Sequence, residues 1–113
     1  MKPLRTPLRV VFYKEDGRWV AHCLEFDICG DGDTHEEALA SLNTAIGMQI
    51  EFSLKNNAPQ NLFSPAGGEY FKMFAAGHEV ACGELHVGVE PLIIERTEMR
   101  EYSKDPTSDL AFA

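Results

Sequence analysis

The stretch Cys29-Gly30-Asp31-Gly32-Asp33-Thr34 decides how this chain folds. It follows a strand-like segment, Arg18 to Phe26, and precedes a long segment with helical periodicity. Because glycine tolerates backbone conformations that other residues avoid, the stretch is predicted to be a sharp corner, with positive φ at Gly32. Thr34 and Glu37 have the spacing of a capping box, in which the glutamate reaches back to the Thr34 N–H. We therefore expect a helix that begins at Thr34.

The segment 34–55 is predicted to be one amphipathic helix. Asp33, Glu36 and Glu37 place negative charge at its start, where the helix dipole favours it. Asn56-Asn57-Ala58-Pro59 is a stop signal. One broad apolar stripe is expected to face a core, and it contains Ala38, Leu39, Leu42, Ala45, Ile46, Ile50 and Phe52.

Upstream of the corner, the alternation of side chains predicts three strands. Leu8 to Tyr13 is the first, and Lys14-Glu15-Asp16-Gly17 is a hairpin signal with Asp-Gly at the turn. The strand from Arg18 follows, and a short third strand is expected at Phe26 to Cys29. The order is therefore β-β-β-α.

Downstream, residues 56–65 are predicted to connect the long helix to a short helix at 65–76. Strands are expected at 79–89 and at 91–102, the latter charged enough to suit a sheet edge, and 103–113 is expected to be a tail. We thus predict a single domain, 1–113, with its core in 8–55 and its connection, short helix and further strands in 56–102. Its class is α+β, an antiparallel β-β-β-α-β sheet backed by the helix at 34–55.

Composition and charge limit the classes of function that suit this chain. The 113 residues carry a net charge of −8, so a nucleic-acid-binding face is not expected, whereas a basic partner suits the charge. The sequence has no apolar run long enough to cross a membrane and no secretory leader pattern at Met1 to Arg9, so a cytoplasmic protein is expected. Cys23, Cys29 and Cys82 form no CxxC pair, and neither a disulfide framework nor a zinc site is predicted.

The sequence gives little support for a catalytic site or a metal site. Asp27, Asp31 and Asp33 have spacing that can wrap a hard cation, but the full calcium-loop pattern is absent. The four histidines, which are His22, His35, His78 and His86, form no HxxxH or HExxH pair. We expect no cofactor and no enzymatic activity. The less favoured alternative is a metal-dependent nuclease that uses the three aspartates.

Two segments carry a family resemblance. The run Phe12-Tyr13-Lys14-Glu15-Asp16-Gly17-Arg18-Trp19-Val20-Ala21 and the run Gly30-Asp31-Gly32-Asp33-Thr34-His35-Glu36-Glu37-Ala38-Leu39 resemble the HicB antitoxin family. The resemblance spans about residues 8–55, and its most specific part is the Gly-Asp-Thr-x-x-Glu-Ala pattern. It implies a partial ribonuclease H-like fold without nuclease activity. It also implies that the protein masks a small basic RNA-cleaving toxin of the HicA type.

Combining the charge with this resemblance, we expect an antitoxin-type binding protein. Its partner-facing acids are predicted to be Glu25, Asp27, Asp31 and Asp33, while Thr34 and Glu37 serve as the structural helix cap. A homodimer or higher oligomer is expected, formed through 91–102 or through the aromatic residues of 65–76. The second interpretation is a stand-alone homo-oligomeric domain with an unknown ligand.

Overall fold

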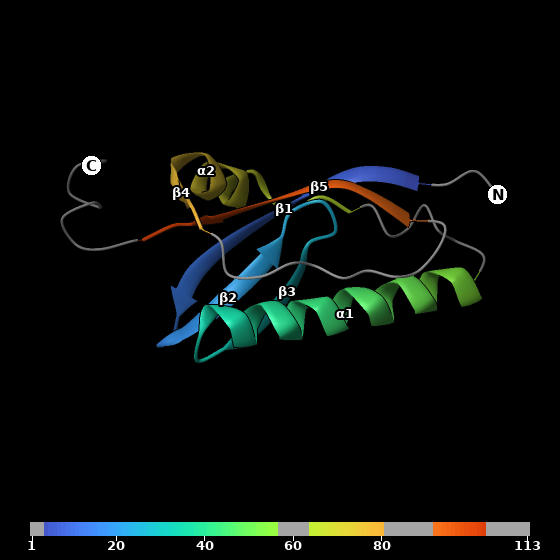
Figure 1. Ribbon diagram of the computed structural model, residues 1–113, viewed down its shortest axis with the longest axis horizontal. Helices are drawn as coiled ribbons and strands as arrows, with labels where there is room; N and C mark the ends of the chain where they lie inside the picture. Colours follow the sequence, from blue (N-terminus) through green and yellow to red (C-terminus); the bar gives the residue numbers. More distant parts are fainter. Residues whose placement is uncertain (1–3, 57–63, 81–91, 104–113) are drawn as a thin grey trace.

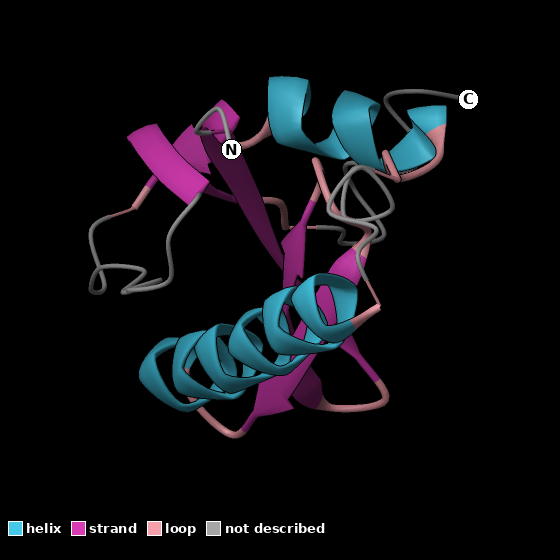
Figure 2. Ribbon diagram, turned by 90° about the vertical axis from the view of Figure 1, so that its right-hand side faces the viewer, coloured by secondary structure: helices cyan, strands magenta, loops and turns pink. Residues whose placement is uncertain are grey.

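The computed structural model describes residues 4–56, 64–80 and 92–103. Five strands form one sheet in the order β3-β2-β1-β5-β4, and helices α1 and α2 cover its opposite faces (Figures 1 and 2). The fold is therefore α+β. The elements are β1 (Leu4–Glu15), β2 (Arg18–Cys23), β3 (Ile28–Gly32), α1 (His35–Lys55), α2 (Gly68–Ala76), β4 (His78–Glu79) and β5 (Leu92–Glu101).

The sheet is mixed, and the prediction of an antiparallel sheet was wrong on this point. β1 pairs antiparallel with β2 but parallel with β5, in a register that runs from Leu4 opposite Leu92 to Phe12 opposite Glu101. The register shifts between Thr6 and Leu8, where Pro7 has no N–H to donate. Side-chain alternation looks the same in both directions, so it carried no information on strand direction.

The hairpin between β1 and β2 is confirmed. Asp16 and Gly17 have φ angles of 53° and 79°, as a two-residue turn of the primed type requires. Lys14 lies opposite Trp19, and Glu15 lies opposite Arg18. The first strand is longer than predicted, because it begins before Leu8 and continues to the turn.

The predicted corner is mostly strand. β3 contains Gly30, Asp31 and Gly32, so the chain turns only at Asp33 and Thr34. The prediction of positive φ at Gly32 was wrong, because Gly17 is the one described glycine with positive φ. Gly32 is needed for space instead: a Cβ there would lie 2.5 Å from the Cβ of Glu37.

The two faces of the sheet carry separate apolar cores. The helix α1 buries Ala38, Leu39, Leu42, Ile46 and Ile50 against one face of the sheet, as the periodicity predicted. Phe52 departs from that prediction, since 64% of it is exposed. The core between α2 and the opposite face of the sheet contains Val11, Tyr13, Val20, Leu24, Ala66 and Phe74.

The second helix begins at Gly68, slightly later than predicted, and packs on the sheet. The Ala66 N–H donates to the Leu24 carbonyl at 2.9 Å, and Tyr70 stacks on Tyr13 with ring centroids 6.0 Å apart. The aromatic residues of this helix therefore cover the protein's own core, which leaves Phe74 buried. Neither described helix has the length and apolarity needed to cross a membrane.

Among the described strands, β5 is the last in sequence but not the outermost in the sheet. β5 lies between β1 and β4, although β4 pairs with it only at Arg100 and Glu101. The predicted strand 79–89 and the predicted tail lie mostly outside the described residues. The Glu101 carboxylate also contacts His35 Nε2 at 2.6 Å and His78 Nε2 at 3.5 Å, which ties the end of β5 to α1 and β4.

Candidate functional site

The strand β3 forms an open edge of the sheet. Within the described parts of the chain its one strand neighbour is β2, so its outer backbone groups face no other strand. Side chains alternate along it: Ile28, Gly30 and Gly32 lie on the α1 side, whereas Cys29 and Asp31 lie on the α2 side. An open strand edge is a ready template for pairing with another chain.

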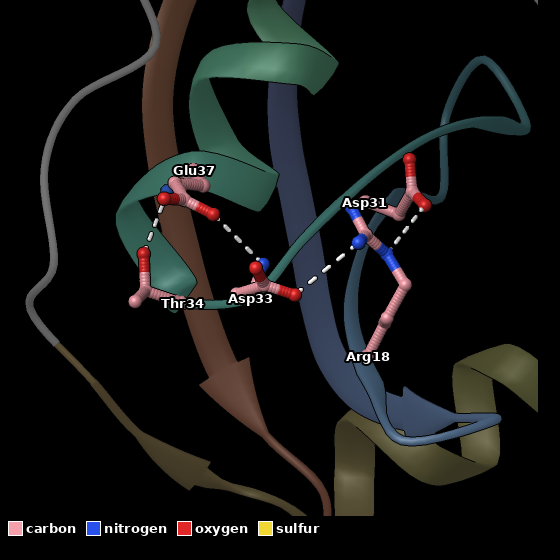
Figure 3. Close-up of polar contacts among 5 residues, drawn as sticks. All are labelled: Arg18, Asp31, Asp33, Thr34 and Glu37. Carbon is pink, nitrogen blue, oxygen red and sulfur yellow. Dashed lines mark hydrogen bonds and ion pairs between the residues drawn. The ribbon is translucent and has the colours of Figure 1, made fainter.

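The helix cap fixes the end of this edge. Thr34 has extended backbone angles, φ −129° and ψ 166°, and its hydroxyl accepts from the Glu37 N–H at 3.1 Å. The Glu37 carboxylate accepts from the Asp33 N–H at 2.9 Å, one residue before the predicted donor, Thr34 (Figure 3). Both ends of this reciprocal pair hold the turn that leads from β3 into α1.

Arg18 holds two carboxylates at the same end of β3. Its Nε donates to Asp31 Oδ2 at 3.1 Å, and its Nη1 donates to Asp33 Oδ1 at 3.2 Å (Figure 3). The carboxylates remain accessible, with 61% of the Asp31 side chain and 77% of the Asp33 side chain exposed. The second oxygen of each carboxylate lies outside these contacts. Arg18 thus orders two acids without removing them from solvent.

A buried histidine orders the acid at the other end. Asp27, just before β3, has a φ of 53° and lies with its Oδ1 2.7 Å from His22 Nε2. His22 is 2% exposed, and its Nδ1 lies 3.0 Å from the Tyr13 hydroxyl. With a proton on Nε2, the imidazole donates to Asp27 and accepts from Tyr13, so each of the three groups is satisfied. Nothing in the sequence pattern predicted this chain of contacts.

The surroundings of the Cys29 thiol, next to Asp27 and Tyr13, disfavour its ionised form. Partial burial is the main cause that raises the pKa of the Cys29 thiol, and the nearby Asp27 charge raises it further. Burial likewise raises the pKa of Tyr13 well above its usual range. A reactive cysteine needs a lowered pKa. The geometry around Cys29 therefore favours the neutral thiol.

Glu25 lies apart from the other predicted partner-facing acids. Its Oε1 accepts from the Arg9 N–H at 2.7 Å, its Oε2 lies 3.5 Å from Arg9 Nη1, and only 13% of its side chain is exposed. Burial raises the pKa of this carboxyl group. Glu25 therefore supports β1, and the edge retains Asp27, Asp31 and Asp33.

Two hollows flank β3, one on each face of the sheet. On the α2 side, an open depression of about 340 Å³ is lined by Glu15, Asp16, Arg18, Val20, Cys29, Gly30 and Asp31. On the α1 side, a groove of about 450 Å³ is lined by Ile28, Ala45, Met48, Gln49 and Phe52. The depression is acidic and the groove is mainly apolar. The exposed Met48 and Phe52 were not predicted as site residues, although Phe52 lies at the margin of the predicted apolar stripe.

The three aspartates do not form one cluster. Asp27 contacts His22, while Asp31 and Asp33 share Arg18. No group of three or more His, Cys, Asp or Glu side chains in the described ranges is placed to hold a metal ion. The three aspartates therefore lie spread along a strand edge and do not surround a common metal position.

Comparison with known proteins adds no assignment, because the chain matches no family model, no curated protein and no solved structure. The resemblance to HicB antitoxins therefore stays a prediction from the two sequence segments that carry it.

Proposed function

We propose that this chain is a non-catalytic binding protein that captures a small basic protein, in the manner of a HicB-type antitoxin that masks an RNA-cleaving toxin. The observation that carries the proposal is the set of ordered, accessible carboxylates along the open β3 edge. Asp27 is held by His22, and Asp31 and Asp33 are held by Arg18. Charges that are already ordered lose less entropy on binding than mobile ones.

The charge of the whole chain supports this proposal. A net charge of −8 attracts a basic protein and orients its approach, and such steering weakens as salt concentration rises. The Gly-Asp-Thr-x-x-Glu-Ala segment that resembles the HicB family, Gly32 to Ala38, leads directly from β3 into α1. The resemblance and the accessible acids therefore meet in one region of the fold.

The test is binding to any small basic protein encoded next to this chain, measured by calorimetry at low and high salt. We expect the double variant D31N/D33N to bind more weakly and with a smaller salt dependence. The matched control is E69Q/E79Q, which removes the same charge from exposed positions on α2 and β4. It is expected to bind like the unmodified chain.

A variant that removes a positive charge tests the opposite change. R18Q leaves both carboxylates in place but removes the cation between them, so we expect faster association at low salt. A parallel assay follows RNA cleavage by the basic protein, which the unmodified chain is expected to stop. Capture that is indifferent to D31N/D33N and to salt contradicts the proposal, as does the absence of any captured basic protein.

A further inference from the structure

We propose that the open edge of β3 binds an extended strand in which apolar and basic residues alternate. This inference rests on the proposed function and names the part of the basic partner that docks. The juxtaposition that leads to it is a strand edge with no strand neighbour among the described residues, flanked by an apolar groove on one face and an acidic depression on the other.

Strand geometry sets the pattern of the ligand. A strand added to β3 continues the pleat, so its side chains point alternately to the α1 side and to the α2 side. On the α1 side they meet the groove at Ile28, Met48 and Phe52, of which the last two are 66% and 64% exposed. An apolar side chain there removes this surface from water.

On the α2 side the same strand meets carboxylates. Glu15, Asp16 and Asp31 line the depression together with a single cation, Arg18. A lysine or arginine side chain entering the depression is attracted by this excess of negative charge, and it finds the Asp31 oxygen that Arg18 leaves outside its contact. The two hollows thus select residues of opposite character at successive positions.

Charge also argues against a second copy of this chain as the occupant. If β3 paired antiparallel with β3 of a second copy, centred on Gly30, Asp27 would lie opposite Asp33 of that copy and Cys29 opposite Asp31. Like charges directly across a strand pair destabilise it. A basic strand has the complementary charge, and its backbone supplies hydrogen bonds that the outer edge of β3 does not make to any described strand.

The closing experiment uses synthetic peptides of about seven residues, within the common range of strand lengths, with a fluorescent label. One peptide alternates valine with lysine, and the other has the same composition with its lysines in one block. We expect the alternating peptide to bind the full chain at least about tenfold more tightly than the block peptide by fluorescence anisotropy. Equal binding of the two, or no binding of the alternating peptide at millimolar concentration, overturns the proposal.

Variants of the groove locate the bound strand. M48K and F52K place a cation in the apolar groove and are each expected to weaken the alternating peptide at least about tenfold. The control is A40K, which puts the same charge on an exposed position of α1 that does not line the groove. Circular dichroism checks that all three remain folded. Peptide binding that M48K and F52K leave unchanged overturns the assignment to this edge.

Two further readouts separate this inference from the proposed function. If the basic protein is captured but M48K and F52K have no effect on its capture, the strand-docking inference fails and the proposed function stands. If the alternating peptide binds as expected but no basic protein is captured, the proposed function fails and the docking surface stands. Sedimentation of the chain alone, with and without F52K, tests whether a second copy of this chain occupies the β3 edge instead. A dimer that F52K dissociates overturns the choice of a basic strand.

Discussion

A side chain at Gly30 would place its Cβ 2.1 Å from the backbone nitrogen of Leu42, so strand β3 and helix α1 touch through their backbones. The nearest atoms belong to the main chain of the helix, including the Ala38 carbonyl oxygen at 2.7 Å. Main-chain atoms in a regular helix cannot rotate away as the end of a side chain does. The separation between the edge strand and α1 is therefore set by the absence of a side chain at this position.

This contact predicts a large penalty for G30A. The added methyl group must push α1 away from β3, and we expect overpacking to lower the free energy of unfolding by about 3 kcal/mol or to prevent folding. G32A is expected to act in the same direction, because its Cβ would lie 2.7 Å from the Ala38 nitrogen. Chemical denaturation monitored by circular dichroism measures both.

The control for these glycines is G47A. Gly47 lies in α1, and apart from its own turn of the helix nothing lies within 4 Å of its added Cβ, so alanine there gains helix propensity without a clash. We expect an increase of up to about 1 kcal/mol in the free energy of unfolding. A comparable loss of stability in all three variants would show that crowding against the helix is not the cause.

The helix cap predicts a smaller effect. T34A removes the hydroxyl that accepts from the Glu37 N–H, and we expect a loss of about 1 kcal/mol. T44A is the matched change inside α1, where the hydroxyl donates to the Ala40 carbonyl on an exposed face. That substitution is expected to be neutral or slightly stabilising, since alanine is the better helix former. A T34A protein as stable as the unmodified chain would contradict the assigned cap.

Glu25 predicts a dependence of stability on pH. Burial raises the pKa of its carboxyl group, so the folded protein keeps this proton to a higher pH than the unfolded chain does. The contribution of Glu25 is therefore fully present below the unfolded pKa and is lost as the pH rises through the folded pKa. The E25Q variant, whose amide oxygen still accepts from the Arg9 N–H, should show its greatest advantage near neutral pH and lose it in acid.

Glu25 also allows a test of the hydrogen bond itself. E25A leaves the Arg9 N–H without its acceptor, and we expect a loss of about 1–3 kcal/mol at neutral pH. Denaturation at a series of pH values measures all three proteins. A difference between E25Q and the unmodified chain that stays constant from acid to neutral pH would contradict the raised pKa.

The two described cysteines are predicted to differ in reactivity. Cys23 is fully buried, and burial raises its pKa to about 12, so iodoacetamide should reach it only after unfolding. Cys29 is accessible to solvent, but partial burial of its thiol raises its pKa, so it should react slowly at neutral pH and faster as the pH rises. Mass-spectrometric peptide mapping over time follows each thiol separately. Rapid alkylation of Cys29 in mildly acidic solution would contradict this assignment.

Local structure was predictable from the sequence. The Asp16-Gly17 turn and the Thr34 cap depend on residues within a few positions of each other, so their spacing was sufficient to predict them. The parallel pairing of β1 with β5 was not predictable, because it joins distant segments and alternation has no direction. The role of Gly32 was also missed, since close approach to α1 exists only in the folded molecule.

The candidate site was predictable in part. Asp27, Asp31 and Asp33 were chosen because they cluster in the sequence, but their place on an open edge follows from β3 being the terminal strand. Glu25 belonged to the same cluster in sequence, and its partner, Arg9, lies sixteen residues away, beyond the reach of local patterns. The exposed groove at Phe52 was hidden because an apolar residue at the margin of a stripe looks like a core residue.

The position of β5 beside β1 has a consequence for how the protein is made. During synthesis β2 emerges soon after β1 and can pair with it, whereas the other edge of β1 has to wait for β5, near the end of the described chain. Until then that edge presents Val10, Val11 and Phe12, three residues that the finished protein buries completely. The nascent chain therefore passes through an interval in which one edge of β1 is unpaired and open to aggregation, and this interval ends only after β5 has been synthesised.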